Sequence, residues 1–328
     1  MIVVTGGAGL IGSTLVRALN AKGRTDIVIV DHLKNGKKML NLQSLNFADY
    51  FDREDFLKAI ESDQFADTVE VVFHLGACSD TQEWDGQYLM RNNYAYSKSL
   101  LTYCQRKKIP LIYASSASVY GNGTVFVEKM EHEAPCNMYA FSKWQFDQYV
   151  RQKHAHFVAP VVGLRYFNVY GPGEAHKGKM ASCVYHFAEQ ILATGALRLF
   201  AGSGGYADGE QRRDFVYSED VVKVNLWVWE NAIPYGIFNV GTGASTTFKA
   251  LAEAVVRWFG RGEISYIPFP EHLVGHYQSF TQADLTLLRQ AGYGAPFQTV
   301  EEGVAQYLDT VSGNYAHGKN PAGSIHGT

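Results

Sequence analysis

Residues 5–12 read Thr-Gly-Gly-Ala-Gly-Leu-Ile-Gly and directly follow the apolar run Ile2–Thr5. The run predicts a β-strand, and Gly12–Lys22 has the apolar spacing of a helix. A glycine turn between a strand and a helix lets the backbone approach a diphosphate, at which the helix N-terminus then points. The stretch therefore predicts a dinucleotide site, with a purely structural turn as the alternative. Its three spaced glycines are Gly6, Gly9 and Gly12.

Strand and helix patterns alternate downstream of this turn. The further predicted strands are Asp26–Asp31, Val69–His74, Leu111–Ser115 and Pro160–Tyr166, and the predicted helices are Ala95–Gln105 and Tyr139–Lys153. Apolar strands separated by helices are typical of a parallel sheet with helices on both faces. We therefore expect an α/β fold in which residues 1–170 form a doubly wound parallel sheet of the Rossmann type.

Glycine-rich loops replace this alternation after residue 170. Gly171–Lys179 and Gly202–Gly209 have the composition of ligand-binding loops, and a helix is predicted between them over Met180–Thr194. We expect a smaller, mainly substrate-binding lobe over residues 171–312, with some segments returning to the sheet. A flexible tail is expected over residues 313–328.

The composition of the 328-residue chain excludes several classes of protein. A net charge of −3 disfavours a nucleic-acid-binding protein, which would be basic. No apolar run approaches the ~18 residues of a membrane span, and the N-terminus lacks a basic signal region. The four cysteines lack metal or disulfide spacing, which predicts free thiols, no metal site and a cytoplasmic protein. They are Cys78, Cys104, Cys136 and Cys183.

An acidic residue and several cations follow the second predicted strand. Asp31 lies where a carboxylate would accept a hydrogen bond from the ribose 2′-hydroxyl of NAD, about 20 residues beyond the glycine turn. Lys38 and Arg53 could instead bind the 2′-phosphate of NADP. The choice between NAD and NADP is therefore open on these residues. Lys34 and Lys37 are interpreted as a solvated basic loop.

Tyr139 and Lys143 form a Tyr-x-x-x-Lys pattern at the start of a predicted helix. Residues four apart share one helix face, so a phenol and an ammonium can reach the same ligand. A neighbouring lysine cation and an oxidised nicotinamide ring both favour the phenolate, and they bring a tyrosine with a free pKa near 10 into working range. Ser116, at the end of a strand, could orient a substrate alcohol against Tyr139; capping of the backbone is the alternative.

Several motifs together resemble the extended short-chain dehydrogenase/reductases that act on nucleotide sugars. They are Thr5–Gly12, Ser115–Gly121, Tyr139–Lys143, Leu164–Pro172, Arg212–Val221 and Phe238–Gly243. Three longer stretches are most similar to the branch of this family that epimerises ADP-heptose at C6″, namely Phe73–Gly86, Gly171–Ser182 and Tyr266–Leu285. The resemblance implies one tightly bound NADP per subunit (NAD being possible), an ADP-heptose substrate, and a homo-oligomer, specifically a homopentamer.

The resemblance also implies roles for individual residues. Tyr139 matches a first acid/base and Lys177 a second, although a lysine in a glycine-flanked loop is otherwise a surface residue. The cofactor contacts fall on Gly6, Gly9, Leu10, Ile11, Gly12, Asp31, His32, Lys38, Arg53, Leu75, Gly76, Ala77, Cys78, Ser79, Asn92, Lys143, Val169 and Lys177. The substrate contacts fall on Asn168, Lys179, His186, Phe200, Ala201, Gly202, Ser203, Arg213 and Tyr277. Arg213 suits a diphosphate, with an ion pair to Asp214 or Asp220 as the alternative; for Tyr277 the alternative is a core residue.

The sequence departs from the family pattern mainly near the substrate loops, so the departures bear on sugar specificity. His32, Leu75, Lys179 and Ala201 stand where relatives commonly have asparagine, glutamate, serine and glutamate, and Gly204–Gln211 is longer than usual. A 4-epimerase of the same family and a non-catalytic NADP-binding protein are the alternative functions. A dehydratase is disfavoured, because Ser116-Ala117-Ser118 lacks the carboxyl groups that eliminating water requires.

Overall fold

Seven parallel strands form the central sheet, in the order β11-β6-β5-β4-β1-β2-β3. The computed structural model describes residues 1–65, 68–271 and 277–316. The strands are β1 (Ile2–Thr5), β2 (Ile27–Asp31), β3 (Asp49–Asp52), β4 (Val71–His74), β5 (Leu111–Ser116), β6 (Val161–Tyr166) and β11 (Tyr235–Val240). The chain runs outward from β1 to β3 and then returns to pair β4 with β1. Strand order therefore reverses beside β1, which is where open α/β sheets bind ligands.

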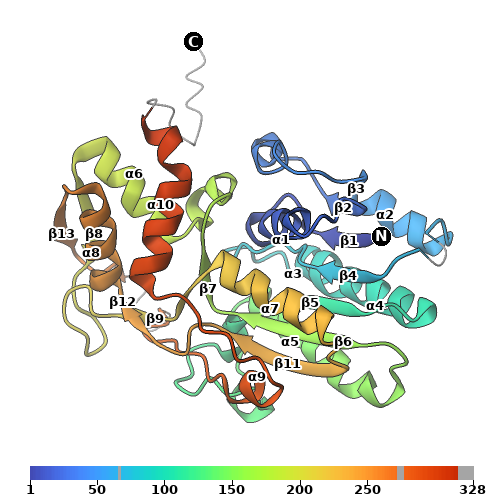
Figure 1. Cartoon of the computed structure of the whole chain (residues 1–328). Coiled ribbons are helices and arrows are strands. Elements are labelled where there is room, and N and C mark those ends of the chain that lie inside the picture. The colour runs from blue at the N-terminus through green and yellow to red at the C-terminus, as the bar shows by residue number, and fades with distance from the viewer. Residues whose placement is uncertain (66–67, 272–276, 317–328) are drawn as a thin grey trace.

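Helices cover both faces of this sheet, as Figure 1 shows. Alternate residues of β1 point to opposite faces, so Ile2 and Val4 join one apolar cluster and Val3 another. The first cluster includes residues of α1 (Leu10–Ala21) and α7 (Ser218–Glu230). The second includes residues of α2 (Arg53–Glu61), α4 (Tyr96–Lys107) and α5 (Met138–Lys153). The expected doubly wound α/β fold is confirmed.

A second lobe with its own apolar core lies beside the sheet (Figure 1). Its parallel strands β8 (Ala196–Phe200) and β13 (Glu263–Ile267) pack with α6 (Cys183–Thr194), α8 (Phe248–Phe259) and α10 (Val300–Ala316). Short paired strands connect the two parts: β7 (Asn168–Tyr170) with β10 (Phe215–Tyr217), and β9 (Arg212–Arg213) with β12 (Thr246–Thr247). The remaining α-helices are α3 (Gly86–Leu89) and α9 (Thr286–Gln290).

Some boundaries differ from the sequence predictions. α1 begins at Leu10, so the glycine turn ends two residues earlier than predicted. The edge strand β3 was not predicted, because its sequence, Asp-Tyr-Phe-Asp, has an aspartate at each end. α10 continues to Ala316, past residue 313 where the tail was expected to begin, and residues 317–328 lie outside the described residues. No helix in the described ranges is long and apolar enough to cross a membrane.

Candidate active site

A cavity of about 690 Å³ opens at the carboxyl ends of the sheet strands. Every residue predicted to contact the cofactor lines it, from Gly6 of the glycine turn to Lys177 of the glycine-rich loop Gly171–Lys179. All four candidate catalytic residues line it too, namely Ser116, Tyr139, Lys143 and Lys177. Of the expected substrate contacts, Asn168 alone belongs to its lining in the part of the chain described.

The glycine turn forms one wall of the cavity. Gly6 has a φ of +70°, and a side-chain carbon there would lie 2.7 Å from the backbone nitrogen of Gly76. A larger residue would therefore strain the turn and push β1 and β4 apart. Gly9 caps α1 without a side-chain hydrogen bond, and the first turn of the helix holds no acidic residue. The N–H groups in the first turn of α1 and the helix dipole therefore fit the diphosphate of a dinucleotide.

Asp31 is already neutralised by a lysine in the structure. Its carboxylate accepts hydrogen bonds from the backbone N–H of Ala8 at 2.9 Å and of His32 at 2.7 Å. The Nζ atom of Lys38 donates to Oδ1 at 2.7 Å. From the sequence, Asp31 was predicted to bind the ribose of NAD and Lys38 to bind the 2′-phosphate of NADP. In the structure the two side chains pair with each other.

Two other groups on this wall have few partners. The guanidinium of Arg53 lies 3.5 Å from the exposed carboxylate of Glu54. The buried Nδ1 atom of His32 has no hydrogen-bond partner among the described residues. Burial, assisted by nearby Lys38, lowers the pKa of His32, so its ring is neutral at neutral pH. Both side chains line the cavity and fit a polar ligand.

Ser116, Tyr139 and Lys143 meet at the ends of β5 and α5. Asn137 begins α5 by accepting a hydrogen bond from the N–H of Ala140 at 2.8 Å, which places Tyr139 in the first turn. The hydroxyl of Ser116 lies near enough to the phenol of Tyr139 to favour its ionised form. Ser116 also accepts from the N–H of Ser118 at 3.2 Å. It therefore caps the backbone and contacts the phenol at once.

Burial has the largest effect on the pKa values of both Tyr139 and Lys143. It raises the pKa of Tyr139, and the nearby hydroxyl of Ser116 opposes that rise. The Nζ atom of Lys143 donates to the carbonyl oxygen of Ala114 at 2.8 Å, and burial lowers its pKa to about 8. Lys143 is not among the groups that shift the pKa of Tyr139 in this structure, and the joint effect of Lys143 and an oxidised nicotinamide ring stays a prediction.

Lys177 reaches the cavity from η6 (Ala175–Met180), a 3₁₀-helix. Its backbone N–H donates to the carbonyl oxygen of Glu174 at 2.9 Å. Lys179, two residues later, is exposed and outside the cavity lining, where the sequence expected a substrate contact. The loop therefore presents one of its two lysines to the cavity.

Arg213 is buried beside aromatic rings and without a carboxylate. Its guanidinium lies 5.0 Å from the ring centre of Tyr277, which in turn packs on Phe200. Its one described hydrogen bond donates to the carbonyl oxygen of Arg212 at 3.1 Å. Burial lowers the pKa of this side chain, which is 7% exposed. A buried cation of this kind needs an anion, and none of the described side chains supplies one.

The alternative ion pairs of Arg213 are not formed. The carboxylate of Asp214 instead accepts hydrogen bonds from the N–H groups of Thr242, Gly243 and Ala283. Asp220 pairs with Lys223 at 2.8 Å. Arg213 therefore has no ion-pair partner among the described residues, and it lies outside the lining of the cavity. His186, Ala201, Gly202 and Ser203 lie outside the lining of the cavity.

Sequence reasoning missed the buried amide of Asn93. It lies in η2 (Met90–Ala95), an irregular π-helix that also carries Asn92. Its Oδ1 accepts from the N–H of Cys78 at 2.9 Å, and its Nδ2 donates to the Oγ of Ser142 at 3.0 Å. Ser142 donates in turn to the carbonyl oxygen of Tyr139 at 2.7 Å. Asn93 thus joins the loop after β4 to the helix that carries Tyr139.

Comparisons with known proteins agree with this geometry. Residues 2–241 match the model of the NAD dependent epimerase/dehydratase family. A relative from Alkalilimnicola ehrlichii named ADP-L-glycero-D-manno-heptose-6-epimerase is 58% identical over 312 residues, which is 95% of this chain and 98% of the relative. The crystal structure of Helicobacter pylori ADP-L-glycero-D-manno-heptose-6-epimerase is 30% identical, with a TM-score of 0.81 and coverage of 95% and 96%. Thermus thermophilus UDP-glucose 4-epimerase in complex with NAD is 26% identical, with a TM-score of 0.77 and coverage of 95% and 99%.

Proposed function

This chain belongs to the NAD dependent epimerase/dehydratase family, and we propose that it converts ADP-D-glycero-D-manno-heptose into ADP-L-glycero-D-manno-heptose by inverting C6″. The observation that carries the substrate is the 58% identity over 95% of the chain to a relative of that name. The reaction class rests on a tyrosine and a lysine, Tyr139 and Lys177, that line one cavity from separate elements.

The chemistry requires oxidation and reduction at one carbon. A secondary carbinol C–H is too weak an acid for a side chain to remove its proton directly. Oxidation to a ketone makes the carbon planar, and return of the hydride to the opposite face inverts it. A bound nicotinamide dinucleotide supplies this hydride chemistry and can remain in place, because the net reaction is redox neutral.

Tyr139 handles the proton of the reacting hydroxyl in the first pose of the sugar. Its phenol lies near Ser116 in the same cavity, so that Ser116 can orient the same substrate hydroxyl. The ammonium of Lys143, held on the carbonyl of Ala114, adds positive charge beneath the site. These contacts hold the acid/base group in one orientation before substrate arrives.

Lys177 handles the proton in the second pose. Inversion requires each face of the ketone to meet the hydride donor, so the sugar must turn and present its oxygen to a second group. Lys177 lies in the glycine-rich loop and reaches the same cavity. On a flexible stem, the ammonium form of Lys177 can donate this proton and its neutral amine form can accept it.

The second lobe binds the ADP part of the substrate in this proposal. Arg213 is buried without a carboxylate, and its planar guanidinium matches a diphosphate in two-point contact. The rings of Tyr277 and Phe248 lie against this guanidinium and would shield the contact from water.

NADP is the proposed form of the cofactor. Lys38 cancels the charge of Asp31, so this carboxylate no longer repels a 2′-phosphate. Arg53 lines the same wall. The double variant Lys38→Ala, Arg53→Ala should lower the ratio of NADP to NAD affinity, measured by fluorescence titration. An unchanged ratio would refute this assignment.

Two alternative functions predict different behaviour. A 4-epimerase shares the fold, as the Thermus thermophilus enzyme shows, and would invert C4″ of a UDP-hexose. A non-catalytic NADP-binding protein would need neither acid/base group. The presence of Tyr139 and Lys177 in one cavity disfavours the latter.

The assembly and location of the protein are also proposed. We expect a homo-oligomer, specifically a pentamer, in line with the resemblance stated above. The cysteines are free thiols, which supports a reducing compartment, namely the cytoplasm.

A direct assay tests the function. Purified protein is incubated with ADP-D-glycero-D-manno-heptose, and the configuration at C6″ is followed by NMR, with UDP-glucose in a parallel sample. We expect an equilibrium mixture of C6″ epimers and no change in UDP-glucose. Inversion of UDP-glucose alone would identify a 4-epimerase, and an inert protein would support the binding role.

A further inference from the structure

A single amide joins two walls of the cavity. Asn41 ends η1 (Gly36–Asn41), a 3₁₀-helix after β2. Its Nδ2 donates to the carbonyl oxygen of Ala8, in the glycine turn, at 3.0 Å. The same nitrogen donates to the carbonyl oxygen of Gly173, four residues before Lys177, at 2.8 Å. The glycine turn and the Lys177 loop therefore meet through this side chain.

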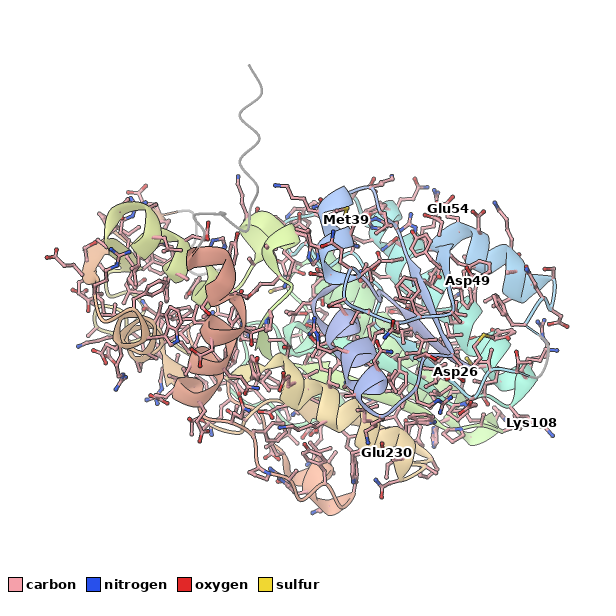
Figure 2. All side chains as sticks on the ribbon, turned by 45° about the horizontal axis from the view of Figure 1, so that its top comes forward. Asp26, Met39, Asp49, Glu54, Lys108 and Glu230 are labelled. Carbon is pink, nitrogen blue, oxygen red and sulfur yellow. The ribbon has the colours of Figure 1, made fainter. Side chains whose placement is uncertain are left out.

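The other end of η1 holds the same loop. Asn35 donates from Nδ2 to the carbonyl oxygen of His176 at 2.9 Å, and its Oδ1 caps η1. We call residues 35–41 the strap. Met39 of the strap, labelled in Figure 2, is 51% exposed, so the strap lies at the surface of the molecule. Two amides, one at each end of the strap, thus bracket residues 173–176.

The loop is anchored on its far side as well. Glu174 is fully buried, and its carboxylate accepts hydrogen bonds from the N–H and the hydroxyl of Ser182, both at 2.6 Å. Gly173 has a φ of +97°, and a side-chain carbon there would lie 3.1 Å from Oδ1 of Asn41. The close approach of strap and loop therefore depends on a glycine at this position.

The strap also reaches the cofactor wall. Lys38, in its middle, is bonded to Asp31, and both residues line the cavity together with His176 and Lys177. Burial, with nearby Lys38, lowers the pKa of His176 to about 4. Its ring is therefore neutral at neutral pH, and its Nδ1–H can donate to the carbonyl oxygen of Gly173 at 3.0 Å. No change of charge disturbs this junction near neutral pH.

We propose that Asn41 is a positioning residue, which ties the Lys177 loop to the glycine turn, places Lys177 at the cavity and slows release of the bound dinucleotide. The role of Asn41 in placing Lys177 for catalysis rests on the proposed function. The two hydrogen bonds by which Asn41 joins the loop to the glycine turn do not depend on it. A redox-neutral reaction benefits from such a tie, because the dinucleotide need not leave between turnovers. Opening the strap breaks the two hydrogen bonds of Asn41 and the one of Asn35 together.

Asn41→Ala removes both donors, and Asn41→Leu removes them while keeping the size of the side chain. Asn20→Ala is the matched control, because the Nδ2 of Asn20 also bridges two carbonyl oxygens, those of Arg24 and Asn46. Asn20 does not line the cavity. Hydrogen exchange of the cofactor-free proteins is measured at the amides of Lys177 and Ala181, which bond within the loop. Release of NADP and kcat are measured on the loaded proteins.

Loss of two ordinary hydrogen bonds corresponds to a change of about tenfold or more. We expect both Asn41 variants to exchange these amides faster, release NADP faster and lower kcat by about that factor, with the Asn20→Ala values unchanged. Unchanged exchange and release in both Asn41 variants would overturn the proposal, and so would equal effects of Asn20→Ala. Faster exchange with normal kcat would overturn the placement of Lys177. If wild-type protein does not epimerise ADP-heptose, the proposed function fails, while exchange and release still report on the tie.

Discussion

At the scale of single residues, the site depends on two proton-transfer groups that come from different elements. Tyr139 belongs to the first turn of α5, and Lys177 belongs to the 3₁₀-helix of a glycine-rich loop. Tyr139→Phe and Lys177→Met each remove one group while keeping most of its shape. Because each pose of the sugar needs its own proton transfer, we expect either change to lower kcat by about 10²–10⁴-fold with the cofactor still bound. Steady-state kinetics at saturating substrate measures this.

Two controls accompany these variants. Tyr149→Phe changes another tyrosine of α5, and Lys34→Met changes an exposed lysine outside the cavity lining. Both should keep normal kcat. A Lys177→Met enzyme with a higher KM and near-normal kcat would make Lys177 a binding contact only and leave Tyr139 as the sole acid/base.

The buried ammonium of Lys143 gives a prediction about stability and pH. Its pKa falls from 10.5 to about 8 in the folded protein, chiefly because burial disfavours the charge. Between these pH values the unfolded chain binds a proton that the folded chain lacks, so this group makes the free energy of unfolding rise with pH. We expect wild-type protein to gain up to about 3 kcal/mol over Lys143→Met between pH 8 and 10.5. Urea unfolding of both cofactor-free proteins at several pH values measures the difference, and parallel curves would contradict the assignment.

At the scale of elements, the π-helix η2 links the loop after β4 to α5. The amide of Asn93 is 3% exposed and bonds to both backbone groups of Cys78 and to Ser142. Asn93→Ala leaves these buried groups without partners, so we expect a loss of about 1–3 kcal/mol in the free energy of unfolding. Denaturant unfolding measures it.

The control for this element is Asn231→Ala, which removes one exposed hydrogen bond to Trp227. Its cost should stay within about 0.5 kcal/mol. If Asn93→Ala lowered the free energy of unfolding no more than Asn231→Ala does, the hydrogen bonds of Asn93 would not stabilise the fold.

Apolar spacing and glycine positions correctly predicted the elements that depend on residues close together in the sequence. The strand, glycine turn and helix at residues 2–21 follow from apolar spacing and glycine alone. The edge strand β3 carries no such pattern, since aspartates flank its two aromatic residues. The irregular winding of η2 likewise leaves no periodic trace.

Pairings between distant residues account for the parts of the site that were not predicted. Arg213 was given two acidic neighbours as alternative partners, yet Asp214 turns to backbone N–H groups near residues 242 and 283. Lys38 and Asp31 were assigned to the ligand separately, and the turn at η1 brings them together. Such choices depend on the folded backbone and not on spacing.

At the scale of the whole molecule, large apolar side chains remain exposed on the single chain. Trp84 is 67% exposed, Met130 62% and Val158 66%. Assembly would remove part of this surface from water, which is favourable. We expect light scattering to give a pentamer of the 36.5 kDa chain, and the mass of one chain would contradict the proposed homo-oligomer.

The two lobes act together in the proposed reaction, because the sheet provides the dinucleotide wall and β9, which connects the lobes, provides Arg213. The central claim is that hydride leaves C6″ and returns to the same carbon from the other side. ADP-D-glycero-D-manno-heptose carrying deuterium at C6″ tests this most directly, with the product examined by mass spectrometry and NMR. We predict an inverted product that keeps its deuterium in ordinary water. Loss of the label to solvent at the rate of inversion would contradict transient oxidation and show direct removal of a proton from carbon.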